Sequence, residues 1–308
     1  MGRINMVENK KNELRKKEKT IFLTAMLLIP IIHFLVFYLY INLSSFTLAF
    51  QDAQGGWTLD NFEYFFKELT AADGSIGLAL KNTLLYFVVG LCFFPTGIII
   101  SYFLYKKIFG YRYFRIVFYL PSIISSMVLV TVFKEFVKPW GPVGLIFEQL
   151  GHPFPAVGLF SLEETATTTI IIYTIWLGLP SNMLMWGGAL TRIPQEVLEA
   201  ACIDGCGIWR ELWSIILPLI MPTISSLLIF SMTGFLGAGG PILLFTGGAS
   251  GTSTLNFWMF NQVYSNKSGV EGFYGVLSAA GLFFTTIATP IVLFVRWLAE
   301  KIPAVEYI

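Results

Sequence analysis

Long apolar runs alternate with short polar segments along the 308 residues of this chain. A helix needs about 20 residues to cross the roughly 30 Å hydrocarbon core of a membrane. Six runs contain no Asp, Glu, Lys or Arg and come close to this length or exceed it. The pattern therefore predicts an all-α membrane protein with six transmembrane helices, at residues 21–42, 82–105, 116–133, 166–190, 214–236 and 273–295. A short re-entrant or interfacial segment is expected near residues 237–250.

The composition agrees with a multi-pass protein of the cell membrane. Hydrophobic residues make up 55% of the chain and charged residues only 13%, whereas soluble domains carry about 25% charged residues. The first apolar run follows a basic tail, as in a secretory signal peptide. It is too long for the apolar region of such a peptide, and no A-x-A cleavage site follows it. We therefore expect this run to be retained as a helix.

Basic residues predict the orientation of the chain. The tail at 1–20, the loops at 106–115 and 191–213, and the segment after the last apolar run together hold 15 of the 20 Lys and Arg residues. By the positive-inside rule these segments face the cytoplasm, so both termini are predicted to be cytoplasmic. We expect a basic cytoplasmic tail at 1–20, a transmembrane permease domain at 21–298 and a cytoplasmic C-terminus at 299–308.

The most informative polar segment is residues 199–222, which reads EAACIDGCGIWRELWSIILPLIMP. It resembles the EAA motif in the cytoplasmic loop of ABC importer permeases, which reads roughly E-A-A-x-x-D-G-A followed by I-x-L-P-x-x-x-P. Cys206 stands where the family has a small alanine, and Leu212 and Trp213 stand where it tends to have phenylalanine. Nine residues match at fixed spacing: Glu199, Ala200, Ala201, Asp204, Gly205, Ile215, Leu217, Pro218 and Pro222.

This resemblance implies a type I ABC importer permease fold in which loop 191–213 docks onto a separate ATPase. In such importers, Glu199 would contact the ATPase and Gly205 would allow the turn. We expect two short helices around a glycine hinge at Gly205 and Gly207. The alternative is that Glu199 and Asp204 serve only as helix N-terminal and capping residues. The full set of expected docking residues is Glu199, Ala200, Ala201, Asp204 and Gly205.

Shorter motifs extend the resemblance over residues 22–298 and point to the maltose, lactose and glycerol-phosphate branch of these permeases. Their order along the chain is more specific than any one of them. They are LDNFEYFF (59–66), ALKNTLLY (79–86), YRYFRIVFYLP (111–121), WGPVGLI (140–146), ILLFTGGASGTST (242–254) and GFYGVLSAAG (272–281).

Pro218 and Pro222 lack backbone donors, so the fifth span is expected to kink where it leaves the loop.

Several kinds of chemistry find no support in the sequence. Ion-coupled carriers keep ionisable side chains inside the bundle, but the six runs contain no Asp, Glu, Lys or Arg. His33 lies in the first run, where a single histidine more often forms a hydrogen bond between helices than carries protons. A P-loop needs a Gly-Lys dipeptide, which the sequence lacks. Cys202 and Cys206 form a pair without the further ligands that a zinc site needs. We therefore expect no catalytic residue, metal or cofactor in this chain, and ATP and Mg²⁺ on a partner ATPase.

The charge-free spans indicate a neutral ligand, since an anion would be expected to meet Arg or Lys on its path. A sugar is held by hydroxyl and amide groups together with aromatic faces. Polar and aromatic residues mix in the fourth and fifth spans, where small and aromatic residues also serve helix packing and the interface belt. The candidate substrate-binding residues are Trp176, Ser181, Asn182, Trp186, Ser231 and Phe235.

These observations lead to a hypothesis of function. The chain is expected to be one permease subunit of an ABC importer for a neutral carbohydrate, and an oligosaccharide is the expected substrate. Its expected partners are a second, homologous permease in a heterodimer, two ATPase subunits and an extracellular solute-binding protein, and no nucleic acid. The segment 251–267, with Asn256, Trp258, Asn261 and Tyr264, is a candidate for contact with that binding protein. An importer for glycerol-phosphate, a polyamine or another small polar solute is the alternative within the class, and a secondary carrier or membrane-embedded enzyme the alternative outside it.

Overall fold

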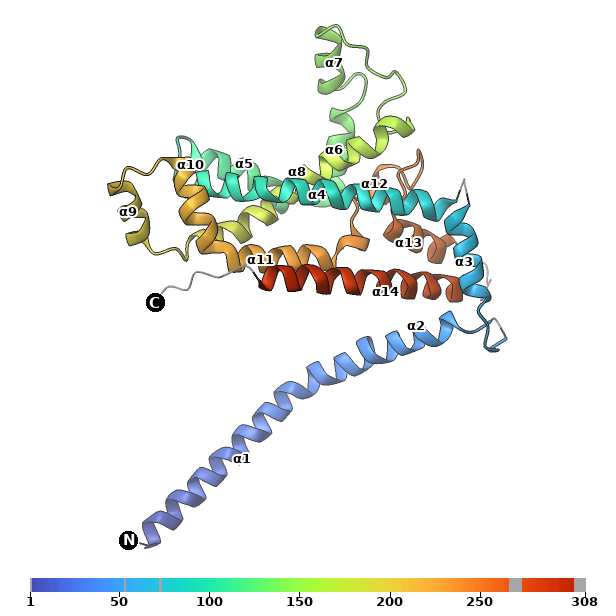
Figure 1. The fold of residues 1–308 in the computed structure, drawn as a ribbon. Coiled ribbons are helices and arrows are strands. Elements are labelled where there is room, and N and C mark those ends of the chain that lie inside the picture. The colour runs from blue at the N-terminus through green and yellow to red at the C-terminus, as the bar shows by residue number, and fades with distance from the viewer. Residues whose placement is uncertain (1, 53, 72–73, 266–272, 302–308) are drawn as a thin grey trace. The chain divides into compact units, whose positions relative to one another are not determined.

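A computed structural model describes residues 2–52, 54–71, 74–265 and 273–301 of the chain. The regular secondary structure of these residues is helical, with no named β-strand. The chain divides into two compact units, residues 1–65 with 270–282 and residues 66–269 with 283–308. The elements are α1 (Gly2–His33), η1 (Phe34–Tyr40), α2 (Ile41–Ala49), α3 (Asp60–Thr70), α4 (Ser75–Tyr105), α5 (Tyr111–Ile123), α6 (Ser126–Phe136), α7 (Pro142–Gln149), α8 (Glu163–Leu190), α9 (Gln195–Ile203), α10 (Ile208–Glu211), η2 (Leu212–Ile216), α11 (Leu217–Thr233), η3 (Phe235–Gly237), α12 (Ile242–Phe245), α13 (Leu255–Ser265) and α14 (Phe273–Glu300) (Figure 1).

Five of the six expected spans are continuous helices long and apolar enough to cross a membrane in the described part of the chain. Each is longer than its charge-free run, because the helix continues into the flanking polar residues. The expected tail at 1–20 is helical from Gly2 and runs directly into the first span. The expected C-terminus at 299–308 lies largely outside the described residues. The five helices are Lys16–Ala49, Ser75–Tyr105, Glu163–Leu190, Ile208–Thr233 and Tyr274–Glu300.

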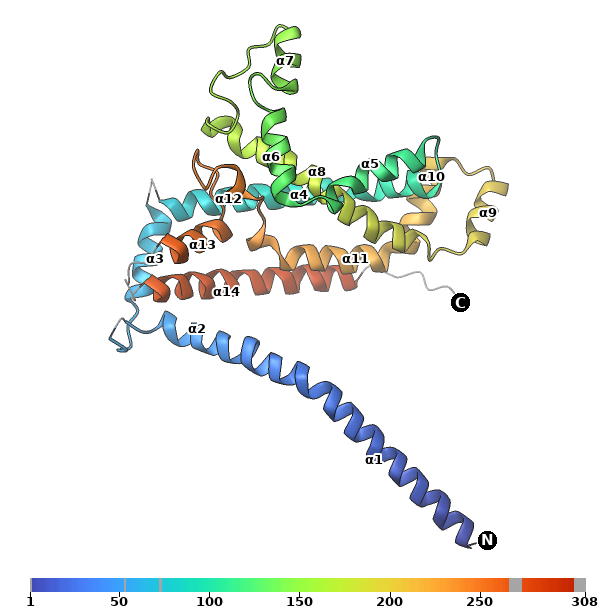
Figure 2. The ribbon, with the colours of Figure 1, turned by 180° about the vertical axis from the view of Figure 1, so that it is seen from behind.

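The third span, expected as one helix at 116–133, differs from the prediction. It consists of α5 and α6, which meet at an angle of 111°. Figures 1 and 2 both show α6 and α7 turning away from the direction of α5. Ile124 and Ser125 have ψ values of 142° and 135°, which are extended. The break follows Pro121 within a serine-rich stretch, and serine hydroxyls compete with the helix for backbone hydrogen bonds.

The first unit contains a buried asparagine in the LDNFEYFF segment. Asn61 is 8% exposed, and its amide donates to the carbonyl of Gln51 at 2.8 Å and to that of Ala49 at 3.1 Å. A side-chain carbon at Gly275 would lie 2.6 Å from this amide, so only glycine fits beside it. These contacts join α3 to the end of α2 and to the start of α14 within this unit.

The second unit is built around α4 and α8, which pack along each other (Figure 1). The two helices approach closely at Gly97, where a side-chain carbon would lie 3.1 Å from Nε1 of Trp186 and 3.2 Å from Cβ of Asn182. Small residues at such crossings let helix backbones approach in membranes, where dispersion contacts hold helices together. Two buried clusters result, one around Tyr102 and Trp186 and the other around Tyr86 and Tyr173.

The ALKNTLLY segment fastens the loop before α13 to α4. Asn82 is 6% exposed, and its amide donates to the carbonyls of Gly251 at 2.7 Å and Ser253 at 2.8 Å. The hydroxyl of Thr83 accepts a hydrogen bond from the Leu255 backbone at 2.8 Å. The segments 79–86 and 242–254, which are far apart in the sequence, therefore meet in space.

Asn82→Ala is expected to destabilise the second unit by about 1–3 kcal/mol, because it leaves two loop carbonyls without their donor in a place that is mostly buried. Thermal unfolding of the detergent-solubilised protein measures this change. Asn42→Ala is the control, since its exposed amide only donates to Tyr38 in the same helical segment. Equal melting temperatures for the two variants would contradict the fastening role of Asn82.

Candidate functional site

The expected docking loop forms two short helices, α9 and α10, at one end of the second unit (Figure 1). Helix α9 ends in a Schellman motif: the Cys206 backbone N–H donates to Ala201 at 2.9 Å and that of Gly205 donates to Cys202 at 3.1 Å. Gly205 has φ +68°, a left-handed conformation that glycine adopts without steric cost. Gly205 therefore allows the turn, as expected, because the backbone at this position is left-handed.

Gly207 does not share this role. Its backbone is extended, with φ −70° and ψ 157°, and an added Cβ would have open space around it. Any residue can adopt this conformation. The glycine hinge expected at Gly205 and Gly207 is thus a single left-handed residue followed by an ordinary N-terminal position of α10.

The expected docking residues differ in exposure. Glu199, Ala200, Asp204 and Gly205 are exposed, whereas Ala201 is 5% exposed and packs inward. Glu199 Oε1 accepts a hydrogen bond from Gln195 one turn earlier, at 2.9 Å. Asp204 is the C-cap residue of α9, so the alternative holds for it as a capping position and not as a helix N-terminal one.

Exposed apolar side chains lie in the same loop as these exposed polar residues. Ile203 is 87% exposed and Ile208 is 52% exposed, and they lie on either side of the Gly205 turn. Trp209, also exposed, packs edge-on against Phe103 of α4. An apolar surface rimmed by polar residues is typical of a contact site for another molecule.

The chain leaves the loop through an irregular helix. Residues Leu212–Ile216 form a π-helical segment between α10 and α11, and the helix direction changes in this region (Figure 1). Pro218 follows two residues later and cannot donate to the carbonyl of Ser214, so the regular ladder is interrupted there. The kink was expected at Pro218 and Pro222. The irregular backbone lies several residues before Pro218, at Leu212–Ile216, and α11 continues as a helix through Pro222.

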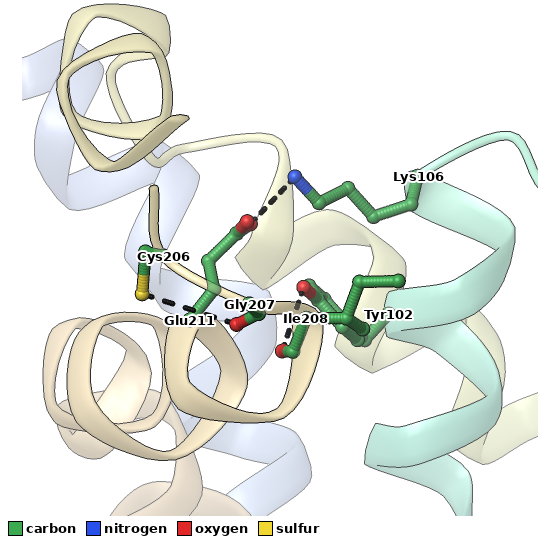
Figure 3. Close-up of polar contacts among 6 residues, drawn as sticks. All are labelled: Tyr102, Lys106, Cys206, Gly207, Ile208 and Glu211. Atoms are coloured by element: carbon green, nitrogen blue, oxygen red, sulfur yellow. Dashed lines mark hydrogen bonds and ion pairs between the residues drawn. The ribbon is translucent and has the colours of Figure 1, made fainter. Parts of the chain in front are cut away.

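An ion pair that the sequence did not reveal joins this loop to the end of α4. Glu211 Oε1 lies 2.7 Å from Nζ of Lys106, the residue that ends α4. The hydroxyl of Tyr102 donates to the carbonyl of Ile208 at 3.2 Å (Figure 3). In the sequence, Glu211 stands just before one apolar run and Lys106 just after another. Because the two residues are far apart in the chain, the sequence alone did not show that they pair.

A cavity of about 410 Å³ lies between α4, α8 and α11 in the second unit. Four of the six candidate substrate residues line it: Ser181, Asn182, Trp186 and Ser231. Tyr86 and Thr174 also line it and were not predicted. The Tyr86 hydroxyl is buried and has no hydrogen-bond partner among the described residues. The residues that form the wall carry no charge, which suits a neutral ligand.

The other two candidates lie outside this wall. Trp176 is 38% exposed and contacts Tyr173 at 5.9 Å between ring centroids. Phe235 is 7% exposed and packs edge-on against Phe87. Trp186 borders the cavity but is only 1% exposed, so most of its ring packs against neighbouring helices.

The segment 251–267 was a candidate surface for a solute-binding protein, and one of its residues does not fit. Trp258 is 5% exposed, and its indole N–H donates to Ser75 of α4 at 3.0 Å. It therefore holds α13 on α4 and is not available to a partner. Asn256, Asn261 and Tyr264 are exposed, and residues 266–267 lie outside the described residues.

Comparison with known proteins supplies further evidence. The model of the family "Binding-protein-dependent transport system inner membrane component" matches residues 93–303. The chain is 29% identical over 182 residues to the multiple sugar-binding transport system permease protein MsmF of Streptococcus mutans, covering 59% of this chain and 62% of that protein. It is 28% identical over 298 residues to protein LplB of Bacillus subtilis, covering 93% and 90% of the two chains. It spans 36% of the maltose/maltodextrin permease MalF of Escherichia coli K12, with 29% identity over 188 residues.

The fold is also found in a solved structure. A chain from the crystal structure of a bacterial ABC transporter involved in the import of the acidic polysaccharide alginate superposes with a TM-score of 0.79 at 24% identity. The match covers 94% of this chain and 98% of that one. At this identity the similarity concerns the overall arrangement of the helices alone.

Proposed function

Because this chain belongs to the family of inner membrane components of binding-protein-dependent transport systems, we propose that it is a permease subunit of an ATP-driven importer for a neutral carbohydrate. Membership of the family confirms the resemblance drawn from the EAA-like segment and assigns the chain to the cytoplasmic membrane as a multi-pass protein. The observation that carries the transport proposal is the combination of an exposed, Schellman-terminated docking loop with an uncharged cavity in the same unit.

The docking loop supports coupling to a separate ATPase. Glu199 and Asp204 offer charges, while Ile203 offers an apolar side chain that is 87% exposed and that a partner would cover. Buried apolar anchors with a polar rim are the usual composition of protein interfaces. We propose that ATP and Mg²⁺ bind to the two partner ATPase subunits, and that this chain contributes no cofactor. The loop and both termini then face the cytoplasm.

The cavity supports a carbohydrate. Its wall offers the amide of Asn182, the hydroxyls of Ser181 and Ser231, and the unpartnered hydroxyl of Tyr86. Aromatic rings of Phe87 and Phe94 add apolar faces. Paired hydrogen bonds together with aromatic faces suit the two kinds of surface on a sugar ring. The names of two relatives, the multiple sugar-binding transport system permease MsmF and the maltose/maltodextrin permease MalF, describe sugar transport by those proteins.

The remaining partners follow from the proposed mechanism. A second permease would complete the pathway, and an extracellular solute-binding protein would deliver the sugar. Closure of the ATPase pair would then move the two permeases between inward-open and outward-open states. An importer for glycerol-phosphate would need a cationic side chain to bind its ligand, and an importer for a polyamine would need an acidic one. The cavity wall of this chain supplies neither.

The test is reconstitution in lipid vesicles with the partner permease, the ATPase and the binding protein. Neutral oligosaccharides, glycerol-phosphate and spermidine are compared for stimulation of ATP hydrolysis. We expect one of the oligosaccharides to stimulate it. Stimulation by either of the other two compounds, but by no oligosaccharide, would show that the carbohydrate assignment is wrong.

Glu199→Lys tests the docking loop in the same system. We expect retention of the ATPase on the tagged permease to weaken by at least about tenfold, because a reversed charge would meet groups arranged for a carboxylate. Glu148→Lys is the matched control, since Glu148 is also exposed but lies in α7, far along the chain from the loop. If both variants retain the ATPase as the wild type does, Glu199 has no docking role.

A further inference from the structure

Helix α10, the second helix of the docking loop, is attached to the end of α4 by an ion pair whose carboxylate is buried. The Glu211 side chain is 5% exposed and that of Lys106 is 33% exposed, with Nζ and Oε1 2.7 Å apart. The contact is an ion pair and not a well-aligned hydrogen bond, since Oε1 of Glu211 has no hydrogen-bond partner of ordinary geometry in the described part of the chain. A buried carboxylate without its cation is strongly unfavourable, so Glu211 and Lys106 are expected to stay together when the loop moves.

Two further contacts hold the same faces together. The Tyr102 hydroxyl, on the α4 turn before Lys106, donates to the carbonyl of Ile208 at 3.2 Å (Figure 3). Phe103 and Trp209 pack edge-on with ring centroids 5.8 Å apart. The last turn of α4 therefore contacts α10 through an ion pair, a hydrogen bond and an aromatic pair.

The position of Lys106 is itself set by the end of α4. The backbone of Lys107 has φ +54°, an uncommon value for a residue other than glycine. Its N–H donates to Leu104 at 3.2 Å, and that of Ile108 donates to Phe103 at 3.4 Å, which ends the helix in a Schellman pattern. Lys106 lies at the C-terminal end of the helix, where a positive charge also interacts favourably with the helix dipole.

The entering side of the loop lacks such polar attachments. Within the described residues, α9 side chains form no ion pair with another element, and Glu199 is bonded only to Gln195 in its own helix. The entering side of the loop makes apolar inward contacts through Ile193, which precedes α9, and Leu198. Among the described residues, the side-chain polar contacts between the loop and the rest of the unit therefore lie on its exit side, at α10.

The attachment leads towards the cavity. Tyr102 and Leu212 belong to the same buried cluster as Trp186, which borders the cavity. Helix α4 continues from Tyr102 to Phe94, Gly90 and Tyr86 in the cavity wall. A displacement of α10 would therefore act on a helix that forms part of the binding site.

We propose that Glu211 and Lys106 are positioning residues that couple movement of the docking loop to α4 and so to the substrate cavity. This inference rests on the proposed function, because it requires the loop to be moved by an ATPase. The carboxylate and the ammonium group do not touch substrate or nucleotide. They make the exit side of the loop and the end of α4 move as one body.

The experiment compares Lys106→Met with Lys107→Met in the reconstituted complex. Lys107 is the adjacent lysine, is exposed, and has no ion pair in the described residues, so the control removes the same charge from the same surface. We expect Lys106→Met to retain the ATPase while lowering substrate stimulation of hydrolysis by about 5-fold to 150-fold, the usual size of a coupling between sites. Lys107→Met should behave as wild type.

A reversed pair separates coupling from folding. Glu211→Gln should show the same loss as Lys106→Met, whereas the double variant Lys106→Glu with Glu211→Lys should recover most of the stimulation. Lys106→Arg keeps the positive charge and is measured in case the other single variants fail to assemble. Its substrate stimulation of ATP hydrolysis should be close to that of the wild type. Normal stimulation in Lys106→Met, or a reversed pair no better than either single variant in an assembled complex, would overturn the proposal.

A second measurement does not require the substrate to be known. Hydrogen exchange of α4 residues 82–94 is recorded with and without ATP and vanadate. We expect a nucleotide-dependent change in the wild type that disappears in Lys106→Met while the ATPase stays bound. A change that persists in Lys106→Met contradicts the coupling role. If the wild type does not bind the ATPase at all, the proposed function itself is wrong, and the two failures are therefore distinguishable.

Discussion

Gly205→Val is expected to remove most ATPase binding by the permease. Gly205 has φ +68° at the end of α9, and a left-handed conformation costs an L-residue roughly 1–2 kcal/mol, with β-branched side chains such as valine the least tolerant. To avoid this cost the chain would give up the two Schellman hydrogen bonds and redirect residues 203–208. We expect at least about a tenfold loss of ATPase retention, corresponding to about 1.4 kcal/mol.

Gly207→Val is the matched control for this variant. It adds the same side chain two residues later, where φ is −70° and ψ is 157° and the added carbon would meet open space. Co-purification of the ATPase with a tagged permease measures both variants. Equal retention in the two would mean that the left-handed turn does not set the shape of the docking surface. Gly205→Asn should be intermediate, because asparagine tolerates the left-handed region better than valine.

Trp186→Ala is expected to cause the largest loss of stability, about 3–5 kcal/mol for removal of a fully buried tryptophan. The side chain is 1% exposed and packs edge-on against Phe94 with ring centroids 5.0 Å apart. Its Nε1 also lies against Gly97, at the close approach of α4 and α8. The cavity left by alanine would join the existing one between the same helices.

Thermal unfolding in detergent measures the effect of Trp186→Ala. Trp140→Ala is the control, because Trp140 is 70% exposed and its removal leaves no internal cavity. A similar melting temperature for both variants would show that Trp186 contributes little to packing and would favour a role in substrate contact. If Trp186→Ala lowers the melting temperature while the protein that stays folded still responds normally to the sugar, Trp186 serves packing and not substrate contact.

Residue type and spacing were sufficient for the docking loop. The EAA-like sequence predicted short helices around Gly205, and the backbone explains this residue directly, because only glycine adopts the left-handed turn without cost. Gly207 was predicted for the same reason and has an ordinary conformation. The two glycines cannot be told apart from sequence, since the same residue type serves both positions. Whether Glu199 contacts an ATPase stays a prediction.

The substrate candidates show a similar division. Asn182, Ser181 and Ser231 line a cavity, as their polar character in apolar spans suggested. Trp176 and Phe235 share the expected spacing but face other neighbours. Helical periodicity gives the faces of one helix, but which face meets a cavity depends on the neighbouring helices. Tyr86 was missed for the same reason, because the sequence of α4 does not show which of its faces meets the cavity.

The sequence by itself determined the membrane class, the number and approximate position of the apolar runs, and the turn at Gly205. These features depend on length, hydrophobicity and local backbone preference, which act over one helix or one turn. Only the tertiary structure decided that the third span bends by 111°, that Trp258 is buried on Ser75, and that Lys106 pairs with Glu211. The last two join residues more than a hundred positions apart. They form because helix packing brings polar groups together in a place where each would be costly without its partner.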